Sequence, residues 1–425
     1  MRNLVVAAAA VMLASSPAFA QTQRIVFGDP AGRVVAHAAP ESDPVRFVMD
    51  GPAPRIAKGG VQGQRPFFVS VDAAPGTYRI TLSVGGALAS DMTVKAELRR
   101  LMLTGVAVPA NGSRTVSFLV NVRTPDIVGG GTVKLKEPRE TVAEAVAWDR
   151  RLTLEFNGHN PGVRSITVEP VPAPTIYLLG DSTVCDQSGE PYASWGQMLT
   201  AMIGPQAVVA NHGESGESVS SSENRGRFAK ILGEIRQGDV FVVQFGHNDM
   251  KEKAKDLKAA TAYRDGLVAW VRAVQAKGAS AIIVTPMNRH SFAAGKVVNT
   301  LEDYPAMARE AARIGGARLI DLNALSKTLY DAFGEQPSLA LFKHDEDGSN
   351  PDSTHHSPFG AWELARLVAA GIADAGLPVS AAVTPAFRQF DPAHPDRLSD
   401  FRVPPSPTRL TMRPLGDDAY KGTPQ

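Results

Sequence analysis

The chain has 425 residues, of which 44% are hydrophobic and 20% are charged. This is the composition of an ordinary globular protein with sizeable cores. Its 44 basic and 43 acidic side chains nearly cancel, and that balance argues against a nucleic acid or an anionic membrane as partner. The sequence contains one cysteine, Cys185, so no disulfide can form within the chain and packing alone must hold the fold together.

The first twenty residues have the pattern of an export signal. Arg2 supplies the positive start, residues 4–13 form an apolar run, and residues 18–20 form a small-residue cleavage site. An apolar run of this length is too short to cross a bilayer, which takes about 20 residues. We therefore expect cleavage after Ala20 and an exported protein, periplasmic or secreted, rather than one with an uncleaved membrane anchor.

Residues 21–172 are expected to form a β-sandwich. Short runs rich in β-branched and aromatic residues alternate with turn signals, which favours two packed sheets. The clearest runs are residues 67–71, 78–84, 115–122 and 152–156. Trp148 has two interpretations: a core residue, the usual position for a large aromatic side chain, or part of a carbohydrate-binding face. The second would suit the galactose-binding-like folds, which this region distantly resembles.

Residues 173–380 change to an alternation of apolar strands and helical segments, which predicts an open parallel sheet with helices on both faces. The predicted strands are residues 175–180, 207–210, 240–245, 281–285 and 319–322, and the predicted helices are residues 257–277 and 304–314. Such sheets bind ligands at the carboxyl ends of their strands. Residues 381–425 are a Pro-rich extension, and their sequence fits a docked segment and a disordered tail equally well.

Ser182 carries the strongest local signal for chemistry. It lies in the tetrapeptide of residues 180–183, directly after the first predicted strand of the parallel sheet. A serine at the carboxyl end of a strand is well placed to present its hydroxyl group to a ligand. The alternative is that Ser182 only caps the next helix.

Asp352 and His355 offer the groups that such a serine needs. Serine is a poor nucleophile until a base takes its proton, and a histidine base must be held in one tautomer by an acceptor. The two residues lie on a loop before a helix that is expected to start near Pro358. Alternatively, they cap that helix. His356 is the rival base, and we prefer His355.

Attack on an ester also builds an oxyanion, which must meet fixed hydrogen-bond donors. Asn248 follows the predicted strand of residues 240–245, so its side-chain amide emerges at the same sheet edge as Ser182. Gly216 follows the strand of residues 207–210 and can expose its backbone N–H. Each residue alone is unremarkable, but together with the serine, aspartate and histidine they predict an esterase site.

These blocks, in this order, resemble the SGNH (GDSL-like) hydrolases and, within them, the rhamnogalacturonan acetylesterase branch. The resemblance covers about residues 174–376 and is carried by residues 179–184, 191–196, 211–218, 226–228, 245–249 and 354–361. It implies a three-layer α/β/α fold of flavodoxin-like order and no metal or organic cofactor. It also implies that an acetylated polysaccharide, pectic rhamnogalacturonan, is the substrate.

Roles carry over to this sequence by motif. The resemblance implies that Ser182 is the nucleophile and gives one backbone N–H to the oxyanion, with Gly216 and Asn248 as the other donors. His355 is then the general acid and base, oriented by Asp352. Glu217 departs from the branch, which often carries Arg at this position. If that Arg holds an anionic substrate, Glu217 weakens the pectin assignment more than the esterase assignment.

Several other residues near the predicted sheet edge have a possible role in the site or in the fold. Arg289 and His290 are expected to bind substrate, because an Arg fork matches the carboxylate of galacturonate; a solvated surface Arg is the alternative. We also expect His356 to be a loop or substrate-side residue. Cys185 is expected to be a packed apolar group rather than a reactive thiol. Residues 345–348 lack the spacing of a calcium loop, so we expect no metal site there.

Three rival functions stay open at this point. Two of them are esterase activities of the same superfamily: deacetylation of xylan and a lipase-like activity. From another class comes a glycan-binding protein whose hydrolase unit is inactive. The sequence does not decide the oligomeric state.

Overall fold

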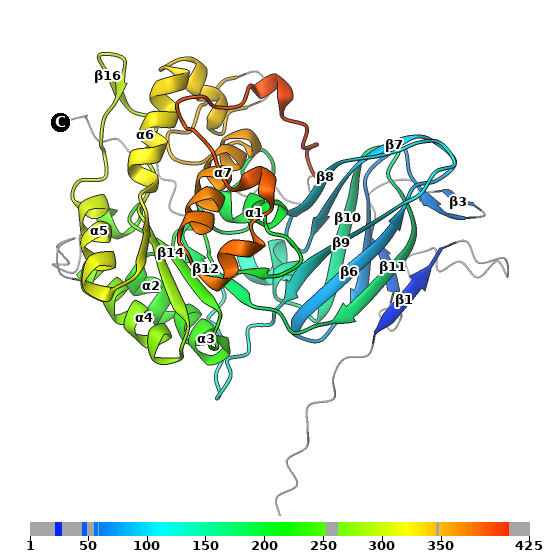
Figure 1. Ribbon diagram of the computed structural model, residues 1–425, viewed down its shortest axis with the longest axis horizontal. Helices are drawn as coiled ribbons and strands as arrows, with labels where there is room; N and C mark the ends of the chain where they lie inside the picture. Colours follow the sequence, from blue (N-terminus) through cyan, green and yellow to red (C-terminus); the bar gives the residue numbers. More distant parts are fainter. Residues whose placement is uncertain are drawn as a thin grey trace, which may run out of the picture.

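The computed structural model describes residues 22–27, 45–48, 55–57, 59–251, 262–345 and 348–407. The predicted export signal, residues 1–20, lies outside this range. Two units lie side by side, a β-sandwich and an α/β unit (Figure 1). None of the helices in the described ranges is both long and apolar enough to cross a membrane.

The first unit is a sandwich of two antiparallel sheets. Its strands are β1 (Gln23–Val26), β2 (Val45–Val48), β3 (Arg55–Ala57), β4 (Gly60–Gln62), β5 (Phe67–Asp72), β6 (Gly76–Val84), β7 (Ser90–Ala96), β8 (Arg100–Val108), β9 (Arg114–Val122), β10 (Arg151–His159) and β11 (Gly162–Pro170). One sheet has the order β3-β4-β11-β6-β9, with β1 paired to β11, and the other has the order β2-β5-β10-β7-β8. The four strands predicted here are present, each slightly longer than expected.

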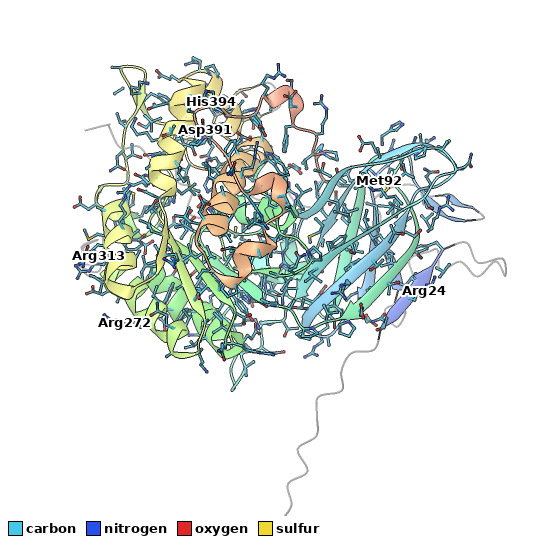
Figure 2. The ribbon with its side chains drawn as sticks, in the orientation of Figure 1. Arg24, Met92, Arg272, Arg313, Asp391 and His394 are labelled. Carbon is cyan, nitrogen blue, oxygen red and sulfur yellow. The ribbon has the colours of Figure 1, made fainter. Side chains whose placement is uncertain are left out.

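Alternation along the strands explains the sandwich. In β6 every second side chain from Tyr78 onward is buried, while those between are half-buried, as expected for a sheet with one covered face. Ile80 and Leu82 of one sheet share a core with Leu154 and Phe156 of the other. The side chains of this core fill the space between the two sheets (Figure 2).

The second unit contains a five-stranded parallel sheet. Its strands are β12 (Thr175–Gly180), β13 (Val208–Asn211), β14 (Val240–Gln244), β15 (Ser280–Val284) and β18 (Arg318–Ile320). Their order, β13-β12-β14-β15-β18, is the flavodoxin-like order of a doubly wound fold. All residues of β12 and β14 are buried, which explains why these strands are continuous apolar runs instead of alternating ones.

Helices cover both faces of the parallel sheet (Figure 1). Helices α1 (Trp195–Leu199), α6 (Leu322–Phe333) and α7 (Pro358–Asp374) share a core with Leu178 on one face. Helices α3 (Arg227–Glu234), α4 (Arg264–Ala276) and α5 (Tyr304–Gly315) share a core with Tyr177 on the other. Neighbouring residues of β12 thus enter different cores. The predicted three-layer α/β/α arrangement is confirmed.

The first part of the C-terminal extension is docked. Phe387 and Phe401 pack on Trp362 of α7, with ring centroids 5.5 and 6.2 Å away. The chain then crosses to the sandwich, where Ser406 Oγ donates to Glu155 Oε2 at 2.8 Å and Lys95 Nζ donates to the Pro404 carbonyl at 2.8 Å. Of the two alternatives for residues 381–425, docking therefore holds for residues 381–407.

One hairpin of the sandwich also packs against the α/β unit. The tip of the β7–β8 hairpin reaches α1, and Leu101 belongs to the core of the α/β unit. Thr200 Oγ1 donates to the Leu101 carbonyl at 2.6 Å. Trp148 lies under the same junction, buried, with the Arg123 guanidinium 4.3 Å above its ring. The core interpretation of Trp148 is confirmed, and the sugar-binding one is wrong.

Candidate active site

A serine, a histidine and an aspartate meet at the carboxyl edge of the parallel sheet. His355 Nε2 lies 2.8 Å from Ser182 Oγ, although 173 residues separate the two in sequence. On the other side of the ring, His355 Nδ1 lies 3.0 Å from Asp352 Oδ2. All three side chains are largely buried. This is the order of groups through which a histidine withdraws a proton from a serine hydroxyl.

The turn after β12 presents Ser182 because Gly180 lets it pack closely. A Cβ atom at Gly180 would lie 2.6 Å from the Gln244 carbonyl oxygen of β14, so any side chain there would separate the two strands. Ser182 does not cap the following helix, because Ser194 does so by accepting from the backbone N–H of Gln197. The capping alternative for Ser182 is therefore wrong.

The loop before α7 holds Asp352 and His355 in one geometry. Asp352 Oδ1 accepts the backbone N–H groups of Thr354 and His355 at 2.7 and 2.9 Å. The cap of α7 is Ser357, which accepts from Gly360 N. Asp352 and His355 are thus free of the capping role that was their alternative.

His356 has a different environment from its neighbour. Its ring is buried, its Nε2 atom lies 2.8 Å from the Tyr330 hydroxyl, and it packs on Phe342 with ring centroids 4.8 Å apart. Burial lowers the pKa of His356 to about 3, so the ring is neutral at ordinary pH. Of the two expectations for His356, the position in the loop holds and the substrate-side position is wrong, because the ring is enclosed by its neighbours.

Two backbone donors and one amide lie in the loops that follow β12, β13 and β14. Among the described residues, neither the Ser182 N–H nor the Gly216 N–H donates to a protein acceptor. Gly216 has φ 74°, a left-handed conformation that glycine adopts without cost. Asn248 Nδ2 donates to the Glu217 carbonyl at 3.0 Å, and its second hydrogen remains available, because an amide nitrogen carries two donors.

Sequence reasoning gave no role to Asp249, the neighbour of Asn248. Its Oδ1 atom accepts Val219 N at 2.9 Å, and its Oδ2 atom accepts Gly246 N at 2.9 Å. The carboxylate thus ties the first turn of helix α2 (Val219–Asn224) to the loop after β14. It fixes the segment after Gly216 relative to Asn248. The signal available in the sequence was its place directly after Asn248.

Asp181 and His247 support the turn from below. Asp181 Oδ1 accepts Thr183 N and Thr183 Oγ1 at 2.9 and 2.7 Å, and Oδ2 lies 3.4 Å from His247 Nδ1. Burial opposes ionisation of Asp181, but the His247 and Thr183 contacts outweigh it and lower its pKa. No group of three or more metal-ligating side chains occurs in the described part of the chain.

Arg289 is the clearest correction to the expected substrate site. Its side chain is buried, and Nη1 donates to the Thr300 carbonyl at 3.1 Å while Nε donates to Thr354 Oγ1 at 3.2 Å. A guanidinium enclosed in this way does not reach a polymer outside, so Arg289 supports the loop of His355. His290 is half-buried, with Nε2 2.9 Å from the Glu335 carbonyl, and it stays a predicted substrate-binding residue.

Tyr192 was not predicted as part of the site. Its ring stands edge-on to the His355 ring with centroids 5.9 Å apart, and Lys343 Nζ lies 5.7 Å from its centroid. Lys343 also pairs with Asp345 at 2.9 Å. Tyr192 belongs to the segment of residues 191–196 that supported the family resemblance, which was the signal for it.

Cys185 and Glu217 both point inward. Cys185 Sγ lies 3.4 Å from Ser215 Oγ in a fully buried position, and burial raises the pKa of its thiol, so it is a packed side chain as expected. Glu217 is buried as well, with Oε1 2.6 Å from Lys136 Nζ and 3.2 Å from Arg225 Nε. Its carboxylate therefore does not face a substrate.

A spacing of three residues between Asp and His does not by itself make a site. Asp391 and His394 have the same spacing and a comparable contact, 2.7 Å, but their side chains are 62% and 84% exposed. Figure 2 shows both at the surface, on the C-terminal extension. The pair near Ser182 differs in its burial and in the serine hydroxyl at the other ring nitrogen.

Comparisons with known proteins show the family of the chain. The profile of the GDSL-like Lipase/Acylhydrolase family matches residues 178–362. The rhamnogalacturonan acetylesterase RhgT of Bacillus subtilis is 36% identical over 214 residues, which are 48% of this chain and 91% of RhgT. The chain belongs to the GDSL-like lipase/acylhydrolase family. It is therefore an ester hydrolase.

Other similar proteins have lower sequence identity to the chain. A rhamnogalacturonan acetylesterase of Emericella nidulans is 23% identical over 43% of this chain and 80% of that protein. The crystal structure of YxiM from Bacillus subtilis is 25% identical and covers 82% of this chain and 96% of that one, with a TM-score of 0.45. An acetylxylan esterase structure from Geobacillus stearothermophilus is 18% identical over 47% of this chain and 93% of that one, with a TM-score of 0.35.

Proposed function

We propose that this protein is an exported carbohydrate esterase that removes acetyl groups from a plant cell-wall polysaccharide, acetylated rhamnogalacturonan, with Ser182, His355 and Asp352 as its catalytic triad. The observation that carries the proposal is the buried chain from Ser182 Oγ through the His355 ring to Asp352. It lies beside two backbone N–H groups that have no acceptor in the described part of the protein.

In the first half of the reaction, Ser182 Oγ attacks the carbonyl carbon of the acetyl ester while His355 Nε2 takes the hydroxyl proton. The developing oxyanion meets the N–H groups of Ser182 and Gly216 and the free hydrogen of Asn248 Nδ2. Loss of one such donor typically costs 10²–10³-fold in rate. Asp352 keeps a proton on Nδ1, so Nε2 is the basic nitrogen. The sugar oxygen leaves with the proton that His355 took.

In the second half, water replaces the sugar. His355 Nε2 takes a proton from the water, whose oxygen attacks the carbonyl carbon of acetyl-Ser182. The same donors hold the second oxyanion. When this intermediate collapses, acetate leaves and the proton returns to Ser182 Oγ. Water is the only co-reactant this scheme requires, and side chains and backbone N–H groups of the chain supply the other groups in both halves.

The choice of substrate is supported by the relatives and by one side chain. RhgT and the Emericella nidulans relative are named rhamnogalacturonan acetylesterases. Glu217, whose charge opposed an anionic polymer, is buried and paired with Lys136. A buried, paired carboxylate exerts little repulsion on a substrate in the solvent, so Glu217 does not itself repel a galacturonate-containing polymer.

The test measures acetate release from acetylated rhamnogalacturonan, acetylated xylan and p-nitrophenyl acetate. Wild-type protein is compared with Ser182→Ala, and Ser399→Ala, at a remote and exposed serine, is the control. We expect release from the pectic polymer that is lost in Ser182→Ala and kept in Ser399→Ala. Release from xylan or the small ester alone would keep the triad and reject the pectin assignment. If wild-type protein released acetate from none of them, a glycan-binding protein would be the better description.

A further inference from the structure

The loop that carries Gly216 is held from outside the α/β unit. Residues 134–144, which belong to the polypeptide between the sandwich strands β9 and β10, lie against it; we call them the bridging segment. We propose that Lys136 and Arg139 of this segment are positioning residues for the Gly216 oxyanion donor, so that the sandwich unit completes the active site. This inference rests on the proposed function.

The bridging segment contacts the residues on both sides of Gly216. Lys136 Nζ donates to the carbonyl of Ser215 and lies 2.6 Å from Glu217 Oε1. Arg139 Nη2 donates to Ser215 Oγ at 3.1 Å, and its Nε atom lies 3.1 Å from Glu214 Oε1. Two cations thus fix three residues of the loop, and one of them binds the carbonyl group of the peptide whose N–H belongs to Gly216.

The orientation of that peptide sets the direction of the Gly216 N–H. The Ser215 carbonyl and the Gly216 N–H belong to one planar unit, so a bond from Lys136 to the carbonyl sets the direction in which the N–H points. An oxyanion donor acts through its direction, because the hydrogen bond weakens steeply as it bends. The electrostatic pull of the lysine on the carbonyl also polarises this peptide and strengthens its N–H as a donor.

Burial makes these contacts strong. The side chains of Arg139 and Glu217 are almost fully enclosed, and that of Lys136 is 10% exposed. Charges enclosed in this way are screened little by solvent. Asn248 Nδ2 is bound to the carbonyl of Glu217, so displacement of this loop moves the Gly216 N–H and the Asn248 amide together.

The segment after Gly216 is anchored within the α/β unit, whereas residues 214–217 are also held by side chains from outside that unit. Asp249 fixes Val219, three residues after Gly216. Lys136 and Arg139 lie outside residues 178–362, which match the family profile. Glu217 directly follows Gly216, and its partner Lys136 comes from the neighbouring unit.

The experiment compares Lys136→Met with Lys136→Arg and with Lys134→Met, which removes an exposed lysine two positions away. A fluorophosphonate titrates the active fraction of each preparation, and kcat and KM for p-nitrophenyl acetate are then expressed per active site. The affinity of a boronic acid that forms a tetrahedral adduct with Ser182 is measured in parallel, together with the melting temperature.

We expect Lys136→Met to lower kcat by about 10-fold, part of the loss that follows complete removal of an oxyanion donor, with KM changed less than twofold. The boronic acid should bind more weakly by the same factor, because its adduct depends on the same donors. Lys136→Arg should recover most of the rate, and Lys134→Met should match wild type. If Lys136→Met does not fold, Lys136→Gln replaces it in the same comparison.

Two results would overturn the inference. One is a kcat per active site that is unchanged in Lys136→Met. The other is a lower melting temperature and active fraction with unchanged boronic acid affinity, which would mean that Lys136 acts on stability only. Wild-type protein that neither reacts with the fluorophosphonate nor cleaves any ester would instead reject the proposed function.

Discussion

Arg100 and Asp186 form an ion pair that joins the two units. Arg100 Nε lies 2.6 Å from Asp186 Oδ2, and their side chains are 1% and 2% exposed. Arg100 also donates to the Asn121 carbonyl within the sandwich. Asp186 accepts from Asn211 Nδ2 at 2.9 Å, at the end of β13. The pair therefore connects the hairpin of the sandwich to the segment that follows Ser182.

Removing Arg100 should destabilise the whole protein. A buried ion pair that loses one partner leaves an uncompensated charge, which costs about 3–5 kcal/mol. We expect Arg100→Leu to lower the free energy of unfolding by this amount in urea. The control is Arg79→Leu, because Arg79 pairs with Glu169 at the surface, with both side chains more than 40% exposed, and such a pair contributes about 0–1 kcal/mol. Equal urea midpoints for the two variants would show that the Arg100–Asp186 pair contributes no more to stability than the surface pair.

The two Asp–His pairs of equal spacing allow a matched test of the base. We expect His355→Gln to lower kcat on p-nitrophenyl acetate by about 10⁴-fold or more, because the serine loses its proton acceptor. His394→Gln, in the exposed pair on the extension, should leave kcat within twofold of wild type. Steady-state kinetics on both variants decide this. A His355→Gln enzyme with more than a tenth of the wild-type rate would exclude His355 as the general base.

Hydrophobic periodicity was sufficient to predict both units of the fold. Alternation in β6 and the unbroken apolar runs of β12 and β14 reflect one-sided and two-sided burial, so burial within each unit produces a recognisable sequence pattern. The contact between the two units produces no such pattern. Leu101 looks like any strand residue, and only the assembled structure shows that it enters the core of the other unit.

Some site residues could likewise be predicted from the sequence, and others could not. Ser182, His355 and Asn248 follow predicted strands or precede a predicted helix, so topology alone brings them to one sheet edge. Arg289 lies at that edge too, but its side chain turns inward to Thr300. The direction of a side chain depends on which acceptors the neighbouring loops provide, and local sequence does not encode this. Lys136 was missed for a related reason: its partner Glu217 is distant in sequence and lies in the other unit.

Glu97, at the tip of the hairpin, should give the protein a pH-dependent stability. Burial raises its pKa from an ordinary 4.5 to about 8, although Arg100 and the Thr153 N–H act against the shift. The unfolded chain releases this proton above about pH 4.5, while the folded protein holds it to about pH 8. The folded state therefore binds more protons in this window, and stability falls as the pH rises through it.

We expect Glu97→Gln to remove that loss, because glutamine keeps the carbonyl oxygen that accepts Thr153 N and carries no charge. The gain in melting temperature over wild type should be larger at pH 8 than at pH 5, measured by thermal unfolding at both values. Glu169→Gln, at an exposed position, serves as the control and should differ from wild type by the same amount at both. If Glu97→Gln also shifts the melting temperature equally at pH 5 and pH 8, the carboxyl group does not titrate in this window, and its proton makes no contribution to folding there.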